Sequence, residues 1–230
     1  MDKTYSDITH RNYVEQCKGL GVIPGVTGVI LAGGASSRMG KNKALLKVGE
    51  LFLLERVYAS IAALFRDVIL VTNTPDIYAF IPCPKVPDVY PGAGSIAGLH
   101  AGLKACSTEL IFAVACDMPF LNGEFIRFLC NDAEAYDAVV PVDRSGRLEP
   151  LHALYAKTSL ITMQESIERG DKSIIHLLDR VTTRMVPNDL FQHIPGAEES
   201  FRNLNTPGEY DDVIGSMCCG DPAGSPRNLA

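Results

Sequence analysis

The sequence predicts a single α/β domain with a mostly parallel, twisted sheet and helices on both faces. Apolar and β-branched runs that suit buried strands alternate with segments of helical apolar spacing, and this order favours parallel strands joined by right-handed crossovers. The run LIFAVAC at 110–116 is apolar throughout, which is typical of a central strand covered on both faces. The 230 residues, 47% of them hydrophobic, can bury a large core without disulfide bridges.

Local patterns place the individual elements. The run TGVIL at 27–31 stops at two glycines and indicates a strand that enters a glycine loop, whereas the segment at 51–65 has the spacing of a helix packed on a sheet. Pro207 suits the first position of a last helix, because its φ is already helical. We expect strands at 27–31, 67–72, 85–88, 110–116, 138–142 and 150–156, and helices at 51–65, 95–105, 124–135, 159–169, 173–178 and 207–217.

Composition limits the domain organisation and the partners. We expect one folded domain over 25–217, an extension over 1–24 and a disordered tail over 218–230 that contains Gly, Pro and Ser. The first residues lack the apolar core of a secretory signal and no apolar stretch is long enough to cross a bilayer, so we expect a cytoplasmic protein. The net charge of −6, with no run of Lys or Arg, argues against nucleic acid and membrane surfaces as partners.

Cysteine and histidine usage gives no sign of a disulfide framework or a transition-metal site. The seven cysteines are an odd number and contain no Cys-x-x-Cys pair. The histidines contain no His-x-x-x-His pair. We therefore expect the cysteines to be mostly small buried hydrophobic residues in a reducing compartment.

The segment LAGGASSRMGKNK at 31–43 carries the strongest functional signal. Two glycines just after a strand let the backbone approach a ligand closely, and the N–H groups of such a turn form an anion-binding concavity. Arg38, Lys41 and Lys43 lie close together in a chain that is acidic overall. We interpret this segment as a phosphate-binding loop.

Two well-known phosphate loops do not match it. Aligning a Walker A motif on the GK pair at 40–41 puts Ala35 at the first glycine and Asn42 at the Ser or Thr that binds Mg²⁺. The dinucleotide fingerprint G-x-G-x-x-G fails as well, because the segment at 33–36 reads GGAS. The sequence therefore excludes P-loop hydrolysis and NAD binding.

A carboxylate follows the most apolar strand. Asp117 is placed at the carboxyl edge of the predicted sheet, where open α/β folds bind ligands. It could bind Mg²⁺, which prefers one or two carboxylates together with phosphate oxygens and water, or it could cap the turn at 118–122. The pattern by itself leaves both interpretations open.

Five motifs, in order along the chain, resemble the molybdenum cofactor guanylyltransferases. The segment at 31–43 resembles the signature L-A-G-G-x-S-x-R-M-G-x-x-K of that family. The segments GSIAGL at 94–99 and CDMPF at 116–120 are similar to G-P-L-A-G-L and C-D-x-P-F. EPLHALY at 149–155 and NLNTP at 203–207 are similar to E-P-L-x-A-L-Y and N-x-N-T-P, so the resemblance extends over about 26–213.

The resemblance implies a Rossmann-like fold of the nucleotide-diphospho-sugar transferase type and a specific reaction. GTP and molybdenum-molybdopterin would give molybdopterin guanine dinucleotide and pyrophosphate, with Mg²⁺ as cofactor and with molybdoenzyme apoproteins or other cofactor-biosynthesis proteins as further partners. The alternatives are a molybdopterin cytidylyltransferase, a sugar-phosphate nucleotidyltransferase and a non-catalytic nucleotide-binding cofactor carrier. CTP-using relatives read L-A-A-G, so Gly33 favours GTP by leaving space for the larger base.

The resemblance also implies the site residues. Lys43 would bridge the α-phosphate, Arg38 would hold the leaving pyrophosphate and Asp117 would bind Mg²⁺, with Asn205 as a second, neutral ligand. Of the two positions that fit a base-proximal Asn of the family, 71 and 73, we choose Asn73 because Val71 has no polar side chain. The implied GTP-binding set is Leu31, Ala32, Gly33, Gly34, Lys43, Asn73, Asp88, Gly98 and Asp117.

Two further positions depart from the family pattern, and two others fit either a functional or a structural role. Asn42 stands where the family commonly has Asp, which could reorganise the loop, and Ser95 replaces a common Pro. His152 fits either the pterin side of the cleft or the core, since a lone His on a half-buried strand is more often structural. Lys172 lies in a region where the family contacts its second substrate, but a solvated helix start explains it equally well.

Overall fold

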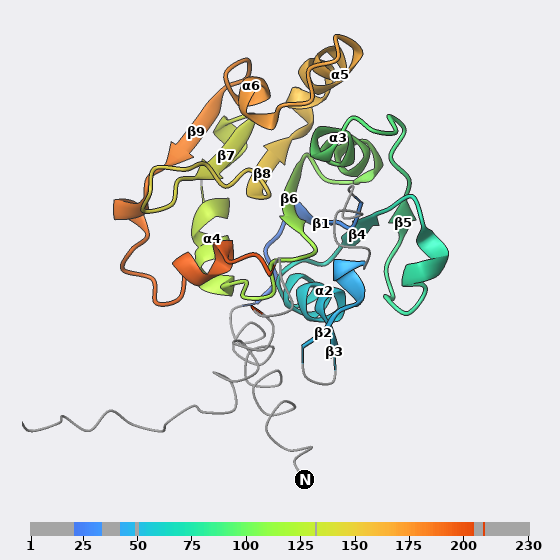
Figure 1. The fold of residues 1–230 in the computed structure, drawn as a ribbon. Coiled ribbons are helices and arrows are strands. Elements are labelled where there is room, and N and C mark those ends of the chain that lie inside the picture. Colours follow the sequence, from blue (N-terminus) through green and yellow to red (C-terminus); the bar gives the residue numbers. More distant parts are fainter. Residues whose placement is uncertain (1–20, 34–41, 49–50, 132, 205–208, 210–230) are drawn as a thin grey trace, which may run out of the picture.

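The structure, a computed structural model, describes residues 21–33, 42–48, 51–131, 133–204 and 209. A seven-stranded sheet with the order β5-β4-β1-β6-β8-β7-β9 forms its centre (Figure 1). Its strands are β1 (Val26–Leu31), β4 (Val68–Val71), β5 (Lys85–Val86), β6 (Leu110–Ala115), β7 (Ala138–Pro141), β8 (His152–Ala156) and β9 (Thr183–Val186). The helices are α2 (Leu53–Leu64), α3 (Ser95–Ala105), α4 (Gly123–Cys130), α5 (Leu160–Glu168) and α6 (Ile174–Leu178).

The sheet is mostly parallel, as the sequence predicts. β1 pairs in parallel with β4 and β6, β5 continues this arrangement beside β4, and β9 is parallel to β7. β8 is antiparallel to both β6 and β7. Because β7 therefore runs in the same direction as β6, the connection at 142–151 returns to the edge where β1, β4 and β6 end.

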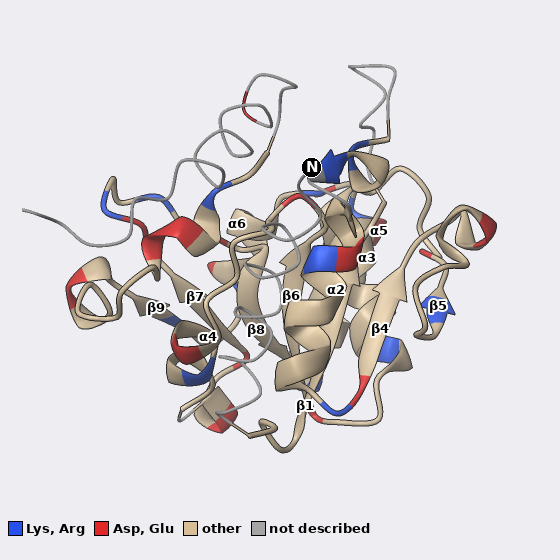
Figure 2. Ribbon diagram, turned by 90° about the horizontal axis from the view of Figure 1, so that it is seen from below, with Lys and Arg blue, Asp and Glu red and all other residues tan. Residues whose placement is uncertain are grey.

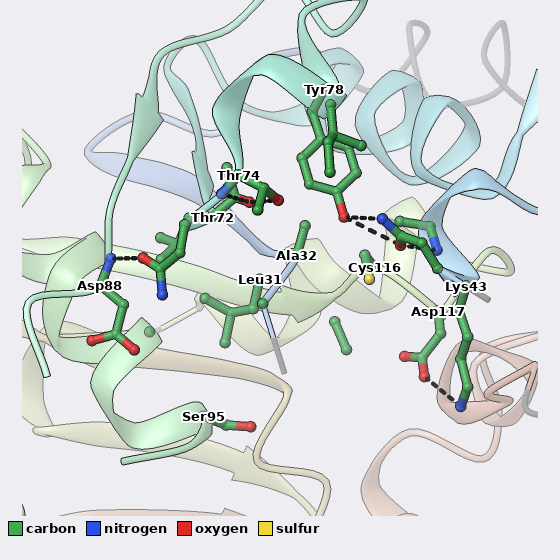
Figure 3. A pocket seen from close by; sticks show the side chains of 18 of the residues that line it. Leu31, Ala32, Lys43, Thr72, Thr74, Tyr78, Asp88, Ser95, Cys116 and Asp117 are labelled. Carbon is green, nitrogen blue, oxygen red and sulfur yellow. Dashed lines mark hydrogen bonds and ion pairs between the residues drawn. The ribbon is translucent and has the colours of Figure 1, made fainter. Parts of the chain in front are cut away.

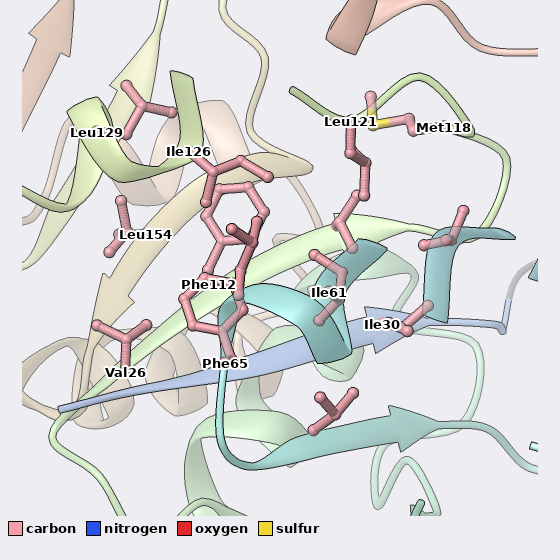
Figure 4. Close-up of a cluster of buried hydrophobic side chains, with 14 of the residues drawn as sticks. Val26, Ile30, Ile61, Phe65, Phe112, Met118, Leu121, Ile126, Leu129 and Leu154 are labelled. Carbon is pink, nitrogen blue, oxygen red and sulfur yellow. The ribbon is translucent and has the colours of Figure 1, made fainter. Parts of the chain in front are cut away.

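Helices cover both faces of the sheet and divide the core into two layers. α2 and α4 pack on one face, where Ile61 and Phe65 contact a cluster that includes Phe112 and Ile126 (Figure 4). α3, α5 and α6 cover the other face (Figure 1). All six residues of β1 are buried, so this strand contributes side chains to both layers.

Glycines let two helices approach β1 closely. A Cβ at Gly28 would lie 2.3 Å from Cγ2 of Ile61 on α2, which is well inside van der Waals contact. On the opposite face, a Cβ at Gly102 of α3 would lie 2.7 Å from Cγ1 of Val29. The central strand is thus held between two helices at distances that a side chain at either glycine would prevent.

Most predicted elements are present, and α3 begins and ends at the predicted residues. The predicted helix at 124–135 is wrong in its second half, because α4 ends at Cys130 and Asn131 takes an extended conformation with a ψ of 130°. β9, the antiparallel pair β2 (Lys47–Val48) and β3 (Leu51–Phe52), and short 3-10 helices were not expected. The predicted helix at 207–217 lies outside the described residues, apart from residue 209.

The ends of the predicted domain are only partly described. In the segment we assign to the extension, Gly21–Pro24 is described, and Ile23 is buried with its N–H donating to the carbonyl of Leu64 at 2.8 Å. The predicted tail at 218–230 lies outside the described residues.

Charged residues avoid the middle of the sheet. In Figure 2 the strands β1, β4, β6 and β8 carry no Lys, Arg, Asp or Glu, and blue and red segments are mixed around the periphery. Within the part of the chain that the structure describes, no helix is long and apolar enough to cross a membrane. Cys83, Cys106, Cys116 and Cys130 are free thiols.

His152 belongs to the core rather than to a substrate cleft. Its side chain is completely buried on β8, and its ring stacks on Phe125 with a centroid distance of 5.4 Å and an interplanar angle of 10°. Phe112 and Phe201 meet the same ring edge-on. Of the two interpretations that the sequence leaves open, the structural one is therefore correct.

Candidate active site

A cavity of about 940 Å³ opens at the carboxyl ends of β1, β4 and β6. This is the edge at which parallel α/β sheets bind ligands, because strand ends and helix starts meet there. Residues from several separate segments of the chain line it (Figure 3). Its wall includes every described member of the predicted GTP-binding set: Leu31, Ala32, Gly33, Lys43, Asn73, Asp88, Gly98 and Asp117.

Lys43 and Asp117 lie beside each other at one end of this cavity (Figure 3). Lys43 is the first residue of the 3-10 helix η2 (Lys43–Leu45), and Asp117 follows β6 after one residue. The Nζ atom of Lys43 lies 3.9 Å from Oδ2 of Asp117, and the two side chains are 21% and 22% exposed. The loop after β1 and the turn after β6 therefore place opposite charges in one cavity, although the residues are far apart in sequence.

The environment of Asp117 affects its ionisation in two opposing ways. Burial raises the pKa of its carboxyl group, because the charged form loses solvation, and the nearby ammonium of Lys43 lowers it. The backbone carbonyl of Asp117 also accepts from the N–H of Leu204 at 3.0 Å. The NLNTP segment thus reaches the backbone of Asp117 through Leu204, whereas Asn205 is outside the described residues.

The donor set around Asp117 fits a hard divalent cation. Among the described residues, no group of three or more His, Cys, Asp or Glu side chains could enclose a metal ion. A single carboxylate in an open cavity is typical of Mg²⁺, which keeps several waters and takes its other ligands from substrate phosphates. It does not fit a protein-enclosed transition metal, which needs three or four protein ligands.

Asn42 and Tyr78 form a hydrogen-bonded pair beside Lys43. Asn42 caps η2 by accepting from the N–H of Ala44 at 3.2 Å, and its Nδ2 donates to Oη of Tyr78 at 2.8 Å. The hydroxyl of Tyr78 in turn donates to Oδ1 of Asn42 at 3.2 Å. Tyr78 ends the 3-10 helix η3 (Pro75–Tyr78) and is 3% exposed.

Polar groups from the ends of β4 and β5 line the opposite side of the cavity. Oδ1 of Asn73 accepts from the N–H of Asp88 at 2.8 Å, and Oδ1 of Asp88 accepts from the N–H of Tyr90 at 2.7 Å. The hydroxyl of Thr72 accepts from the N–H of Thr74 at 3.2 Å. Asn73 and Asp88 are thus brought together, and each orders the backbone of this wall.

The loop between β5 and α3 completes the wall. Gly92 and Gly94 have φ values of 80° and 76°, a left-handed conformation that other residues rarely adopt. Ser95 begins α3 at the cavity, and Gly98 faces it one turn later. Lys172 is exposed just before α6, and its Nζ donates to the carbonyl of Gly92 at 2.7 Å, which ties this loop to the start of α6.

The structure leaves some predicted residues untested and adds others. Arg38 and Gly34 lie outside the described residues. Thr72, Thr74, Tyr78 and Cys116 line the cavity without having been singled out. Thr72 is the last residue of an expected strand, so its position at the sheet edge could have been inferred, whereas nothing near Tyr78 in sequence marks it.

The fold and the cavity together define a class of protein. A lysine that follows a glycine-rich loop, a carboxylate beside it and a roomy cavity at the carboxyl edge of an α/β sheet are the parts of a nucleotidyltransferase, an enzyme that aligns a nucleoside triphosphate and neutralises its phosphates.

Comparison with known proteins identifies the family. The MobA-like NTP transferase domain matches residues 28–184. A probable molybdenum cofactor guanylyltransferase of Carboxydothermus hydrogenoformans is 34% identical over 189 residues, which are 82% of this chain and 95% of the relative. The molybdenum cofactor guanylyltransferase of Syntrophotalea carbinolica is 33% identical over 184 residues, 80% of this chain and 88% of the relative. The chain belongs to the molybdenum cofactor guanylyltransferase family.

Solved structures agree with this assignment. Molybdopterin-guanine dinucleotide biosynthesis protein A from Archaeoglobus fulgidus superposes with a TM-score of 0.73 at 25% identity, covering 84% of this chain and 98% of the other. The 4-diphosphocytidyl-2C-methyl-D-erythritol synthase of Anaerococcus prevotii shares the fold with a TM-score of 0.61 at 15% identity, covering 84% of this chain and 96% of the other. The expected nucleotide-diphospho-sugar transferase type of fold is confirmed.

Proposed function

We propose that this enzyme transfers GMP from GTP to molybdenum-molybdopterin, forming molybdopterin guanine dinucleotide and releasing pyrophosphate. The observation that supports the proposal is the close approach of Lys43 to Asp117 at one end of the cavity, in a chain of the guanylyltransferase family. A cation and a carboxylate this close together can serve one phosphate group and the metal ion bound to it. Conversely, a pure cofactor carrier has no need of groups that stabilise a leaving phosphate.

The reaction needs no nucleophile from the protein. An oxygen of the terminal phosphate of molybdopterin attacks the α-phosphorus of GTP, and the bond to the bridging oxygen breaks as pyrophosphate leaves with the electron pair. Lys43 neutralises charge on the α-phosphate, and we assign Arg38, outside the described residues, to the leaving pyrophosphate. Asp117 would hold Mg²⁺, which when bound supplies charge neutralisation at the phosphates.

The cavity offers distinct regions for base and phosphates. Lys43 and Asp117 form the phosphate end, whereas Asn73 and Asp88 form the wall beyond β4 and β5, which we assign to the guanosine. Among the residues that the structure describes, none lies within 4 Å of a Cβ built at Gly33, so the described wall leaves space at this position. That space supports the choice of GTP over CTP. The free thiols of the described part are in keeping with a reducing cytoplasm.

A substrate screen tests the proposal. The full chain is incubated with molybdenum-molybdopterin, Mg²⁺ and each of the four nucleoside triphosphates, and the dinucleotide and pyrophosphate are quantified. Of the four triphosphates, we expect only GTP to give product. We expect Lys43→Ala to lower the rate at least about 10²-fold while its circular dichroism spectrum stays that of the wild type. Turnover with CTP would favour the cytidylyltransferase, and near-normal turnover of Lys43→Ala would remove Lys43 from the mechanism.

A further inference from the structure

The hydrogen-bonded pair of Asn42 and Tyr78 lies next to Lys43, whose side chain is long and flexible. Lys43 reaches the cavity on a long aliphatic side chain with about 2 kcal/mol of rotamer entropy, so its backbone must be well placed if its ammonium is to meet the α-phosphate. Asn42 precedes it directly and caps η2. The backbone conformation at Asn42 therefore influences the direction in which the side chain of Lys43 extends from the backbone.

Tyr78 provides the fixed partner. Its ring belongs to the core layer that contains α2 and α4, and the carbonyl of Tyr78 accepts from the N–H of Ile81 at 3.0 Å. Its hydroxyl is the part that reaches the cavity, where it meets Asn42 (Figure 3). A buried residue that follows β4 thus holds the residue next to Lys43, across 36 positions of sequence.

We infer that Asn42 and Tyr78 act together as a positioning pair that holds Lys43 toward the triphosphate. This inference rests on the proposed function and deepens it, because neither residue needs to touch a substrate. The phenol and the amide exchange two hydrogen bonds, and the same amide oxygen fixes Ala44 in the first turn of η2. Loss of the pair lets Lys43 move while the fold remains, and a shift of about 1 Å in a catalytic group can cost about 10²-fold in rate.

The chemistry of the pair predicts which replacements work at position 42. A carboxylate also accepts from a phenol hydroxyl and from the N–H of Ala44, so Asn42→Asp keeps two of the three hydrogen bonds of the amide. Asn42→Ala keeps none of them. Asp and Asn at this position are thus alternative partners for one hydroxyl, whereas Ala is not.

The test measures kcat, KM for GTP and Tm for Asn42→Ala, Tyr78→Phe, the double variant and Asn42→Asp. We expect each of the first two to lower kcat about 10-fold with a smaller change in KM, and the double variant to be no slower than the slower single variant. Asn42→Asp restores kcat to within about threefold of the wild type, but gives no such gain when combined with Tyr78→Phe. Tyr58→Phe is the matched control, because its hydroxyl donates to the carbonyl of Pro82 away from the cavity.

The outcomes separate this inference from the proposed function. A wild-type chain that makes no dinucleotide from GTP contradicts the proposed function. An active wild type with Tyr78→Phe or Asn42→Ala within twofold of its kcat overturns the inference, and so do single effects that multiply in the double variant. If Tyr78→Phe lowers Tm strongly, the comparison of Asn42→Ala with Asn42→Asp decides, because residue 42 lies at the edge of the core and only partly buried.

Discussion

The buried imidazole of His152 makes the stability of this fold sensitive to acid. Three phenylalanine rings surround it, and neither ring nitrogen has a hydrogen-bond partner among the described residues. Burial lowers the pKa of His152 from 6.5 to about 3, because a protonated ring there would lose its hydration without gaining a partner. The unfolded chain therefore binds a proton at moderately acidic pH that the folded chain does not.

The size of the effect follows from this difference in pKa. Above a pH of about 6.5 both states are neutral at His152 and stability is unaffected, whereas below it the unfolded state gains about 1.4 kcal/mol per pH unit. The contribution is a loss of about 2 kcal/mol near pH 5 and of about 4 kcal/mol near pH 3, where half of the folded molecules carry the proton as well.

Urea unfolding followed by circular dichroism tests this prediction. The free energy of unfolding is measured near pH 8 and pH 5 for the wild type and His152→Leu, with the exposed His193→Gln as control. We expect the decrease between the two pH values to be about 2 kcal/mol smaller in His152→Leu than in the other two proteins. Equal decreases in all three would refute the reasoning. The same variant should keep its kcat/KM at pH 8, because His152 does not line the cavity.

Three further predictions concern the site and the sheet. Asp117→Asn should lower turnover by about 10²-fold or more without lowering Tm at neutral pH, because burial raises the pKa of Asp117 and the folded state therefore disfavours its charge; a lower Tm contradicts this. Gly33→Ala should leave Tm unchanged but shift kcat/KM from GTP toward CTP, and an unchanged ratio argues against a role in base choice. Gly28→Ala should lower the free energy of unfolding by about 1–3 kcal/mol in urea titrations, since its Cβ would overlap Ile61; an unchanged midpoint would show that α2 yields freely.

The sequence predicts those parts of the fold that have a strong local pattern. The apolar run of β6 and the spacing of α3 specify buried elements with little ambiguity. β9 reads TRMV, carries charge, and lies at the edge of the sheet, so its pairing with β7 comes from tertiary contacts that no local pattern reveals. The antiparallel direction of β8 is hidden for the same reason, because a buried run looks alike in both directions.

Some residues of the site can also be recognised in the sequence, whereas others are revealed only by the fold. Lys43 and Asp117 are recognisable because glycines and a buried strand accompany them, and the structure brings them within 3.9 Å. Tyr78 looks like any core aromatic residue in sequence, and only the fold shows that its hydroxyl meets Asn42. His152 shows the reverse case, since its motif suggests chemistry while its surroundings are entirely aromatic and aliphatic.

The close contact at Gly28 has a consequence for how such enzymes can change. α2 rests directly on this glycine, and η2, which begins with Lys43, packs against α2. The distance between β1 and α2 therefore affects the position of η2 and, through it, the position of the Lys43 ammonium. A mutation in the packing between β1 and α2 can change turnover while every residue that contacts the nucleotide stays the same. Searches for variants with altered turnover should therefore include these buried positions.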